Sequence, residues 1–157
     1  MRIDIMTDIE TLGHKTESTI FQISAIAFDI NTGEYISKFN QIADITENEK
    51  MSVTGSTIVW WLNTNKELLT ELLNKGEGSS EKLLRDFNDW LIELSLDGEL
   101  HLWGNGILFD NKMIQHQLES IGLMYPIHYK NDRDVRTIVD LTSAKLGITE
   151  KELKEKF

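Results

Sequence analysis

The sequence predicts an α/β fold in which a mixed β-sheet is flanked by helices. Residues 3–8 and 20–28 alternate apolar and polar side chains, as half-buried strands do. Beyond residue 55, much of the chain repeats its apolar side chains at the spacing of helices. Because strands come first and helices then alternate with strands, we expect the sheet to begin antiparallel and to gain parallel strands later.

The first three expected strands are residues 3–8, 20–28 and 35–40. The turn residues Asn31, Thr32 and Gly33 lie between the second and the third, which is a hairpin signal. Three strands joined in this way form an antiparallel meander. Such a meander is unlike the start of a doubly wound dinucleotide-binding fold.

Three helices are expected next. The Ser-Thr pair at 56–57 can cap a helix that runs through residues 58–62, and leucines repeat through a second short helix at 66–73. Residues 83–94 keep the i, i+3, i+4, i+7 spacing of an amphipathic helix, which should end before Gly98.

The remaining elements alternate. Residues 100–104 form a short apolar strand, and residues 109–121 form a helix that stops at a glycine. Residues 127–129, after the only proline, read as an edge strand or an extended loop. The apolar spacing in residues 134–146 suits a helix, and Thr149 then caps a final one.

Length and composition favour one folded domain, residues 1–157, with 40% hydrophobic and 27% charged residues. The chain has no cysteine, so disulfides and thiolate metal sites are excluded, and any metal ion must be held by oxygen or histidine ligands. The net charge of −10 argues against a broad basic surface for nucleic acid, unless bound divalent ions supply the positive charge. The sequence opens without a secretion leader and has no run of roughly 20 apolar residues, which predicts a cytoplasmic protein with no membrane contact.

Two carboxylates stand two residues apart near the end of the first expected strand. Side chains alternate along a strand, so Asp8 and Glu10 share one face while Ile9 points to the other. A divalent cation such as Mg²⁺ or Mn²⁺ would relieve the repulsion between the two charges. For this pair alone, an acidic turn without a ligand is the simpler interpretation.

Two segments give the pair a context. In both of them the sequence resembles the DEDD (DnaQ-like) 3′→5′ exonucleases, whose motifs Asp-x-Glu-Thr and Asn-x-x-x-(Phe/Tyr)-Asp occur in this order. The matching segments are Asp8-Ile9-Glu10-Thr11 and Asn105-Gly106-Ile107-Leu108-Phe109-Asp110.

Within that family, the chain is most similar to the exoribonuclease-like group that includes phage exonuclease A. This group carries a Ser-Thr-Ile-x-Trp-Trp segment between the two motifs and an Arg-Asp-x-Arg-Thr segment after them, and the resemblance covers nearly the whole chain. The matching segments are Ser56-Thr57-Ile58-Val59-Trp60-Trp61 and Arg133-Asp134-Val135-Arg136-Thr137.

The resemblance implies a ribonuclease H-like fold and a metal-dependent exonuclease that removes nucleotides from single-stranded DNA or RNA 3′ ends by phosphodiester hydrolysis. In the complete family site, two Mg²⁺ or Mn²⁺ ions clamp the phosphate. Asp8, Glu10 and Asp110 would be the catalytic, metal-binding residues. A purely local N-capping role is the alternative for Asp110.

Substrate contacts are implied for six further residues: Thr11, Leu12, Trp61, Asn105, Phe109 and Arg133. The backbone of the first two would hold the terminal nucleotide, and Leu12 would wedge against its base. Adjacent tryptophans on a helix point about 100° apart, so one of them can stack on a base while core packing remains the plainer role for the pair. Arg133 and Arg136 suit phosphate, but a helix-start pairing explains them equally well, and Asp134 is expected to cap a helix.

The family's last motif, a His followed five residues later by Asp, does not occur after His14, His101, His116 or His128. The expected single domain therefore lacks its C-terminal catalytic helix. Three interpretations are open: the chain is a truncated product; another subunit, as in a homo-oligomer, or another residue fills the gap; or the domain binds nucleic-acid ends or a protein partner without cutting. An acidic protein-interaction domain without metal is the remaining hypothesis. The sequence leaves open DNA against RNA, and the oligomeric state.

Overall fold

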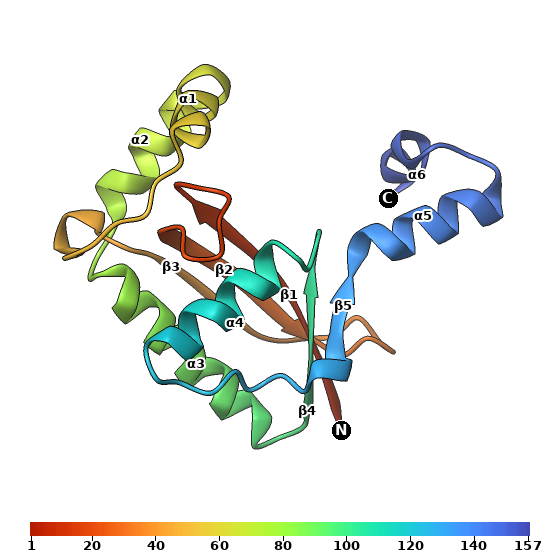
Figure 1. Cartoon of the computed structure of the whole chain (residues 1–157). Coiled ribbons are helices and arrows are strands. Elements are labelled where there is room, and N and C mark those ends of the chain that lie inside the picture. Colours follow the sequence, from red (N-terminus) through yellow and green to blue (C-terminus); the bar gives the residue numbers. More distant parts are fainter.

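A five-stranded mixed sheet forms the centre of the computed structural model, which describes all residues 1–157 (Figure 1). The strand order is β3-β2-β1-β4-β5. The first three strands form an antiparallel meander, β4 runs parallel to β1, and β5 runs parallel to β4. The expected mixed α/β sheet is therefore confirmed. The strands are β1 (Arg2–Thr11), β2 (Ile20–Phe28), β3 (Tyr35–Ile42), β4 (Glu99–Gly104) and β5 (Asp132–Asp134).

Six helices surround the sheet. Helices α3 and α4 pack on one of its faces, and α1 and α2 form a pair beside the end of β3 (Figure 1). Helices α5 and α6 follow β5 and contact each other (Figure 1). The helices are α1 (Gly55–Thr64), α2 (Lys66–Lys75), α3 (Ser80–Ser95), α4 (Asp110–Ser120), α5 (Val135–Leu146) and α6 (Glu150–Lys156), with short 3₁₀ turns at Ile45–Glu47 and Tyr129–Asn131.

The main core lies between the sheet and helices α3 and α4. Ile3, Ile5 and Ile9 of β1 point into it, each 5% exposed or less. Phe87 of α3 is fully buried in it and makes an edge-to-face contact with Phe39 of β3, at 5.2 Å between ring centroids. The alternation in β1 thus gives one face to this core and leaves the even-numbered residues for the other.

A smaller core joins the α1–α2 pair to the end of the sheet. Its centre is Trp61, whose ring lies 5.9 Å from that of Phe21. Five buried residues make up this second core: Leu12, Phe21, Trp61, Leu69 and Leu72. The segment that follows β1 is therefore fixed by α1, far along the chain.

One sequence expectation needs correction. Helix α1 begins at Gly55, one residue before the expected Ser-Thr cap, and its N-cap Thr54 makes no side-chain cap bond. For residues 127–129, the loop is the alternative that the structure shows, and it leads into a 3₁₀ turn. The edge strand is β5, which pairs with Leu102–Gly104 of β4. The expected cap at Thr149 is confirmed, with a complete capping box to Glu152.

Helices α5 and α6 pack loosely compared with α3 and α4. Only Ser143 of α5 and Leu153 of α6 are buried, whereas Ile138 and Leu141 are 50% and 61% exposed. In Figure 1 this pair extends away from the sheet beyond β5. No helix of the chain has the length and apolar character that a bilayer crossing would require.

Candidate functional site

The first two candidate residues lie within the last four residues of β1, on the face opposite the main core. Asp8 is exposed and Glu10 is half-buried, while Ile9 between them is 5% exposed and points into the core. The strand continues to Thr11 because its ladder with β2 does, pairing Glu10 with Gln22. The two carboxylates therefore project from a paired strand and not from a free turn.

Polar side chains of β2 and β3 continue this face. Gln22 and Ser24, which pair with Glu10 and Asp8, both donate hydrogen bonds to Asn40 Oδ1, at 3.0 and 2.9 Å. This row is hydrophilic, so the carboxylate pair borders a polar surface.

Asp110, the third candidate, is the first residue of α4 and is only 5% exposed. The N-cap position belongs to Phe109, and no side chain makes a cap bond there, so the structure does not support a purely capping role for Asp110. Two glycines allow the approach. A Cβ at Gly104 would lie 2.6 Å from Asn111 Oδ1, and Gly106 has a φ of 105°, which disfavours other residues.

Electrostatics link the three carboxyl groups. Burial, reinforced by the charge of Asp8, raises the pKa of Glu10 to about 7. Burial, and then the charges of Asp8 and Glu10, raise the pKa of Asp110 to about 7. Partial burial also raises the pKa of Asp8. Residues from two distant segments therefore repel one another at a single edge of the sheet.

The donor chemistry of this cluster fits a hard divalent cation, because carboxylate oxygens are the ligands that Mg²⁺ and Mn²⁺ prefer and a cation would relieve the repulsion. In the side-chain conformations of the structure, however, no three His, Cys, Asp or Glu side chains lie close enough to hold one metal ion. The arrangement is a cluster of suitable ligands and not a closed coordination shell.

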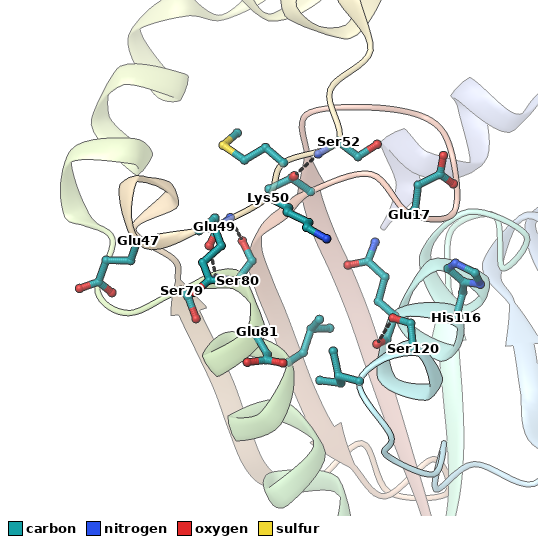
Figure 2. Close-up of a pocket in the computed structure, with 16 residues that line it drawn as sticks. Glu17, Glu47, Glu49, Lys50, Ser52, Ser79, Ser80, Glu81, His116 and Ser120 are labelled. Carbon is teal, nitrogen blue, oxygen red and sulfur yellow. Dashed lines mark hydrogen bonds between the residues drawn. The ribbon is translucent and has the colours of Figure 1, made fainter.

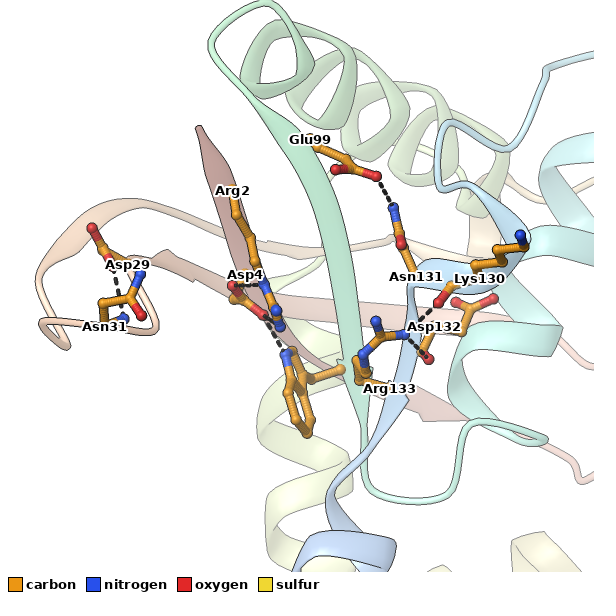
Figure 3. A network of polar contacts seen from close by, with 10 residues as sticks. Arg2, Asp4, Asp29, Asn31, Glu99, Lys130, Asn131, Asp132 and Arg133 are labelled. Atoms are coloured by element: carbon orange, nitrogen blue, oxygen red, sulfur yellow. Dashed lines mark hydrogen bonds and ion pairs between the residues drawn. The ribbon is translucent and has the colours of Figure 1, made fainter.

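The two arginines of the segment after the second motif lie in different surroundings. Arg133, expected to contact the substrate, donates to the backbone carbonyl groups of Lys130 and Asp132 along the edge of the sheet (Figure 3). Arg136 is the arginine next to the carboxylates, because its charge acts on Asp110 and lowers the pKa of that group. The structure thus places Arg136, and not Arg133, beside the carboxylates, and the expected substrate contact of Arg133 stays a prediction.

Asp134 joins the second motif to α5. It is the N-cap of α5, accepting from the Arg136 amide at 3.0 Å, as expected. The same carboxylate accepts from the amides of Gly106 at 3.0 Å and Ile107 at 3.4 Å. One side chain therefore fixes the loop before Asp110 against the start of α5.

Three expected substrate contacts are already engaged within the protein. Leu12 is 3% exposed, in the smaller core, so it does not present a wedge to a base. Trp61 is also 3% exposed, and its indole N–H donates to the Thr11 carbonyl at 3.1 Å. Thr11 itself donates to the Gly13 carbonyl at 2.6 Å. The expectation that Trp61 stacks on substrate is contradicted, because the ring is enclosed by the core.

Trp60, the neighbour of Trp61, is the accessible tryptophan. It is 54% exposed, and its ring lies edge-on to that of Trp61 at 5.2 Å. In the second motif, Asn105 is exposed and Phe109 is 37% exposed, so both remain open to a ligand as expected.

A cavity lies elsewhere, between the 47–52 loop, the start of α3 and the end of α4 (Figure 2). It has a volume of about 790 Å³, and its wall includes Glu17, Glu49, Lys50 and His116. None of the nine residues expected at the functional site lines it. The cavity is thus separate from the carboxylate cluster.

Comparison with known proteins identifies a family that matches nearly the whole chain. The model of the 3′-5′ exoribonuclease Rv2179c-like domain matches residues 3–156. An exodeoxyribonuclease of enterobacteria phage T4 is 25% identical over 162 residues, covering 87% of this chain and 70% of the phage protein.

Solved structures share the fold at lower identity. Cell-death related nuclease 4 has a TM-score of 0.63 at 13% identity, covering 94% of this chain and 49% of its own. The nuclease domain of 3′hExo, a DEDDh family member bound to rAMP, has a TM-score of 0.56 at 16% identity, covering 95% and 72%. A metal-free complex of E. coli exonuclease I with single-stranded DNA has a TM-score of 0.61 at 16% identity, covering 92% and 30%. This chain thus spans about half of the first of these proteins and less than a third of the last.

The family match covers almost every residue, both carboxylate motifs among them, and the solved structures confirm the ribonuclease H-like fold. The chain therefore belongs to the family of 3′-5′ exoribonuclease Rv2179c-like domains.

Proposed function

We propose that this chain is a metal-dependent 3′→5′ exonuclease domain that hydrolyses nucleotides from single-stranded ends. The main support is the gathering of Asp8, Glu10 and Asp110, from two motifs far apart in sequence, at one edge of the sheet, where the charge of Asp8 raises the pKa of Glu10 and the charges of both raise the pKa of Asp110. Such a cluster is costly for stability alone, and perturbed carboxyl groups are typical of functional sites.

The three carboxylates would hold the divalent ions, Mg²⁺ or Mn²⁺, after side-chain rotation brings their oxygens together. When bound, such ions supply positive charge to the phosphate and activate water. The protein's own part is to hold these ligands on a rigid strand and a helix start. Asp8 and Glu10 lie on paired β1, and Asp110 opens α4.

The accessible aromatic and amide groups beside the cluster would position the nucleotide. Phe109 precedes Asp110 directly, and Asn105 begins the same loop. Trp60 takes the base-stacking role that the sequence had given to Trp61, since it is the one with an exposed ring. Stacking on an aromatic ring tolerates any base, which suits an enzyme that trims ends irrespective of sequence.

A second candidate function is binding of nucleic-acid ends without cleavage. None of the four histidines is followed by Asp five residues later, so the motif that would supply a general base does not occur in these 157 residues. General-base help is worth about 10² to 10⁴ in rate. Binding and cleavage therefore have to be measured separately.

Calorimetry with Mn²⁺ tests the metal site. We expect binding to the wild-type protein and its loss in Asp8→Ala and Asp110→Ala. An Asp89→Ala variant, which removes an exposed carboxylate on α3, is the matched control and should bind normally. Unchanged Mn²⁺ binding in the Asp8 and Asp110 variants would contradict the metal-site proposal.

A labelled oligonucleotide tests cleavage and its direction. With Mn²⁺, a 3′-terminal label should be released as a mononucleotide at once, while a 5′-labelled copy should shorten stepwise. Parallel DNA and RNA strands identify the preferred sugar, and Asp8→Ala is the inactive control. Binding with no shortening of either strand selects the second candidate function. The reverse order of label release would contradict the proposed direction.

A further inference from the structure

Arg136 carries a guanidinium group that the protein itself leaves unpaired. It is the second residue of α5, and its side chain is exposed. The five ion pairs of the structure involve Arg2, Lys75, Lys82, Arg85 and Lys154, and none involves Arg136. Its side chain makes no hydrogen bond within the protein, while its backbone amide donates to the Asp134 carboxylate at 3.0 Å.

The position of this guanidinium is nevertheless well defined. A Cβ built on Gly106 would lie 3.5 Å from Arg136 Nε and 3.7 Å from its Cζ, so the guanidinium packs over the glycine of the second motif. The Asp134 carboxylate holds the backbones of Gly106 and Arg136 together at 3.0 Å each. The loop that leads to Asp110 and the base of the Arg136 side chain are therefore one rigid unit.

The charge of Arg136 is felt at the carboxylate cluster. It is the one cation among the groups that shift the pKa of Asp110, and it lowers that pKa against the effect of burial and of Asp8 and Glu10. Arg133 is not among the groups that shift this pKa, and its guanidinium donates to two backbone carbonyl groups on the edge of the sheet (Figure 3). In a chain of net charge −10, a free cation beside the acidic site is the exception.

We propose that Arg136 binds a backbone phosphate of the nucleic acid beside the Asp8, Glu10 and Asp110 cluster. This assignment rests on the proposed function. It adds a positively charged residue that attracts the nucleic-acid phosphates toward the negatively charged carboxylate cluster. A planar guanidinium can meet two phosphate oxygens at once, and it keeps its charge at every accessible pH. Its packing over Gly106 orders the side chain before the ligand arrives, which lowers the entropic cost of binding.

Fluorescence anisotropy of a 5′-fluorescein-labelled single-stranded oligothymidylate tests the proposal. The titration is made with Ca²⁺ as the divalent ion, and a gel verifies that the strand stays intact. We expect Arg136→Gln to weaken binding about tenfold or more, as the loss of a charge-assisted contact does. Arg136→Lys keeps the charge but loses the two-pronged geometry, so its loss should be smaller. Arg133→Gln is the matched control and should bind like the wild type.

The salt dependence separates a phosphate contact from a structural role. Each phosphate neutralised in a single strand adds about 0.7 to the slope of log affinity against log salt concentration. We expect the slope to fall by about that amount in Arg136→Gln and to stay unchanged in Arg133→Gln and Arg136→Lys. Mn²⁺ calorimetry on Arg136→Gln should give an affinity at least equal to that of the wild type, since a nearby cation has been removed.

Two results overturn the assignment. If Arg136→Gln binds the oligonucleotide within twofold of the wild type, or with an unchanged salt slope, Arg136 does not contact phosphate, while the proposed function stands. If the wild-type protein binds no single strand at any divalent-ion concentration, both proposals fail. A melting temperature equal to that of the wild type verifies that each variant is folded.

Discussion

The two faces of β1 do different work. Its odd-numbered residues, such as Ile3 and Ile5, are fully buried beneath α3 and α4. Its even-numbered residues face the other way, where Met6 is 39% exposed and Asp8 and Glu10 meet Asp110. One strand thus contributes to the core from one side and presents the candidate metal ligands on the other, and a shift of the register by a single residue would exchange the two.

The largest expected effect contrasts the two faces directly. Ile5→Ala opens a cavity in the main core and should lower the free energy of unfolding by about 2 to 5 kcal/mol. Met6→Ala, its neighbour on the open face, should cost less than about 1 kcal/mol. Urea denaturation followed by circular dichroism measures both. Equal losses would mean that the open face is covered by something in solution.

Asp110→Asn tests whether the carboxylates of the open face favour metal binding and at the same time destabilise the metal-free fold. The substitution keeps the shape and removes one of three repelling charges, so Mn²⁺ affinity should fall more than tenfold while the melting temperature in EDTA rises. Calorimetry and thermal melts measure the two effects. The interpretation fails if the metal-free protein becomes less stable, because the charge of Asp110 would then be favourable in the fold.

The two tryptophans of α1 provide a second comparison between an exposed side chain, Trp60, and a buried one, Trp61. Trp60→Ala should leave stability unchanged and weaken oligonucleotide binding by about 1 to 3 kcal/mol, the usual value of a stacked base. Trp61→Phe keeps most of the packing but loses the bond to the Thr11 carbonyl, and should cost about 1 kcal/mol of stability. Anisotropy and denaturation distinguish them. The opposite assignment of effects would return the stacking role to Trp61.

The smallest expected effect is a pH dependence of the metal-free protein. Glu10 and Asp110 have pKa values of about 7 in the fold, above their ordinary values of 4.5 and 3.8, so the folded state binds their protons more tightly than the unfolded state. Their protonation therefore favours the fold, and this contribution is lost as pH rises through about 7. Melting temperatures in EDTA should fall between about pH 5 and about pH 7. A Glu10→Gln, Asp110→Asn double variant should lack this slope.

The spacing of apolar residues was sufficient to predict the helices and strands that bury one face in the core. The strands β1 and β2 and helix α3 place apolar residues at regular intervals, because each turns one face to the main core. The second motif could also be recognised from its glycines, since a Cβ at Gly104 would collide with Asn111 and Gly106 has a positive φ that other residues disfavour. In each of these cases, the feature that determines the structure is visible within a short stretch of sequence.

The rest depended on contacts that the sequence does not encode locally. Strand β5 consists of Asp132, Arg133 and Asp134, so no apolar alternation reveals it. Neither the choice between Trp60 and Trp61 nor that between Arg133 and Arg136 could be read from sequence. The first depends on how α1 lies against Thr11, and the second on which guanidinium reaches Gly106.

The shortness and charge of β5 bear on the behaviour of the protein at high concentration. An edge strand exposes unpaired carbonyl groups that can template pairing with a neighbouring molecule, and this is a common route to aggregation. Here the strand is three charged residues long, and the Arg133 guanidinium occupies the carbonyl groups of Lys130 and Asp132. By binding these carbonyl groups, Arg133 disfavours the pairing of a further strand with this edge of the sheet.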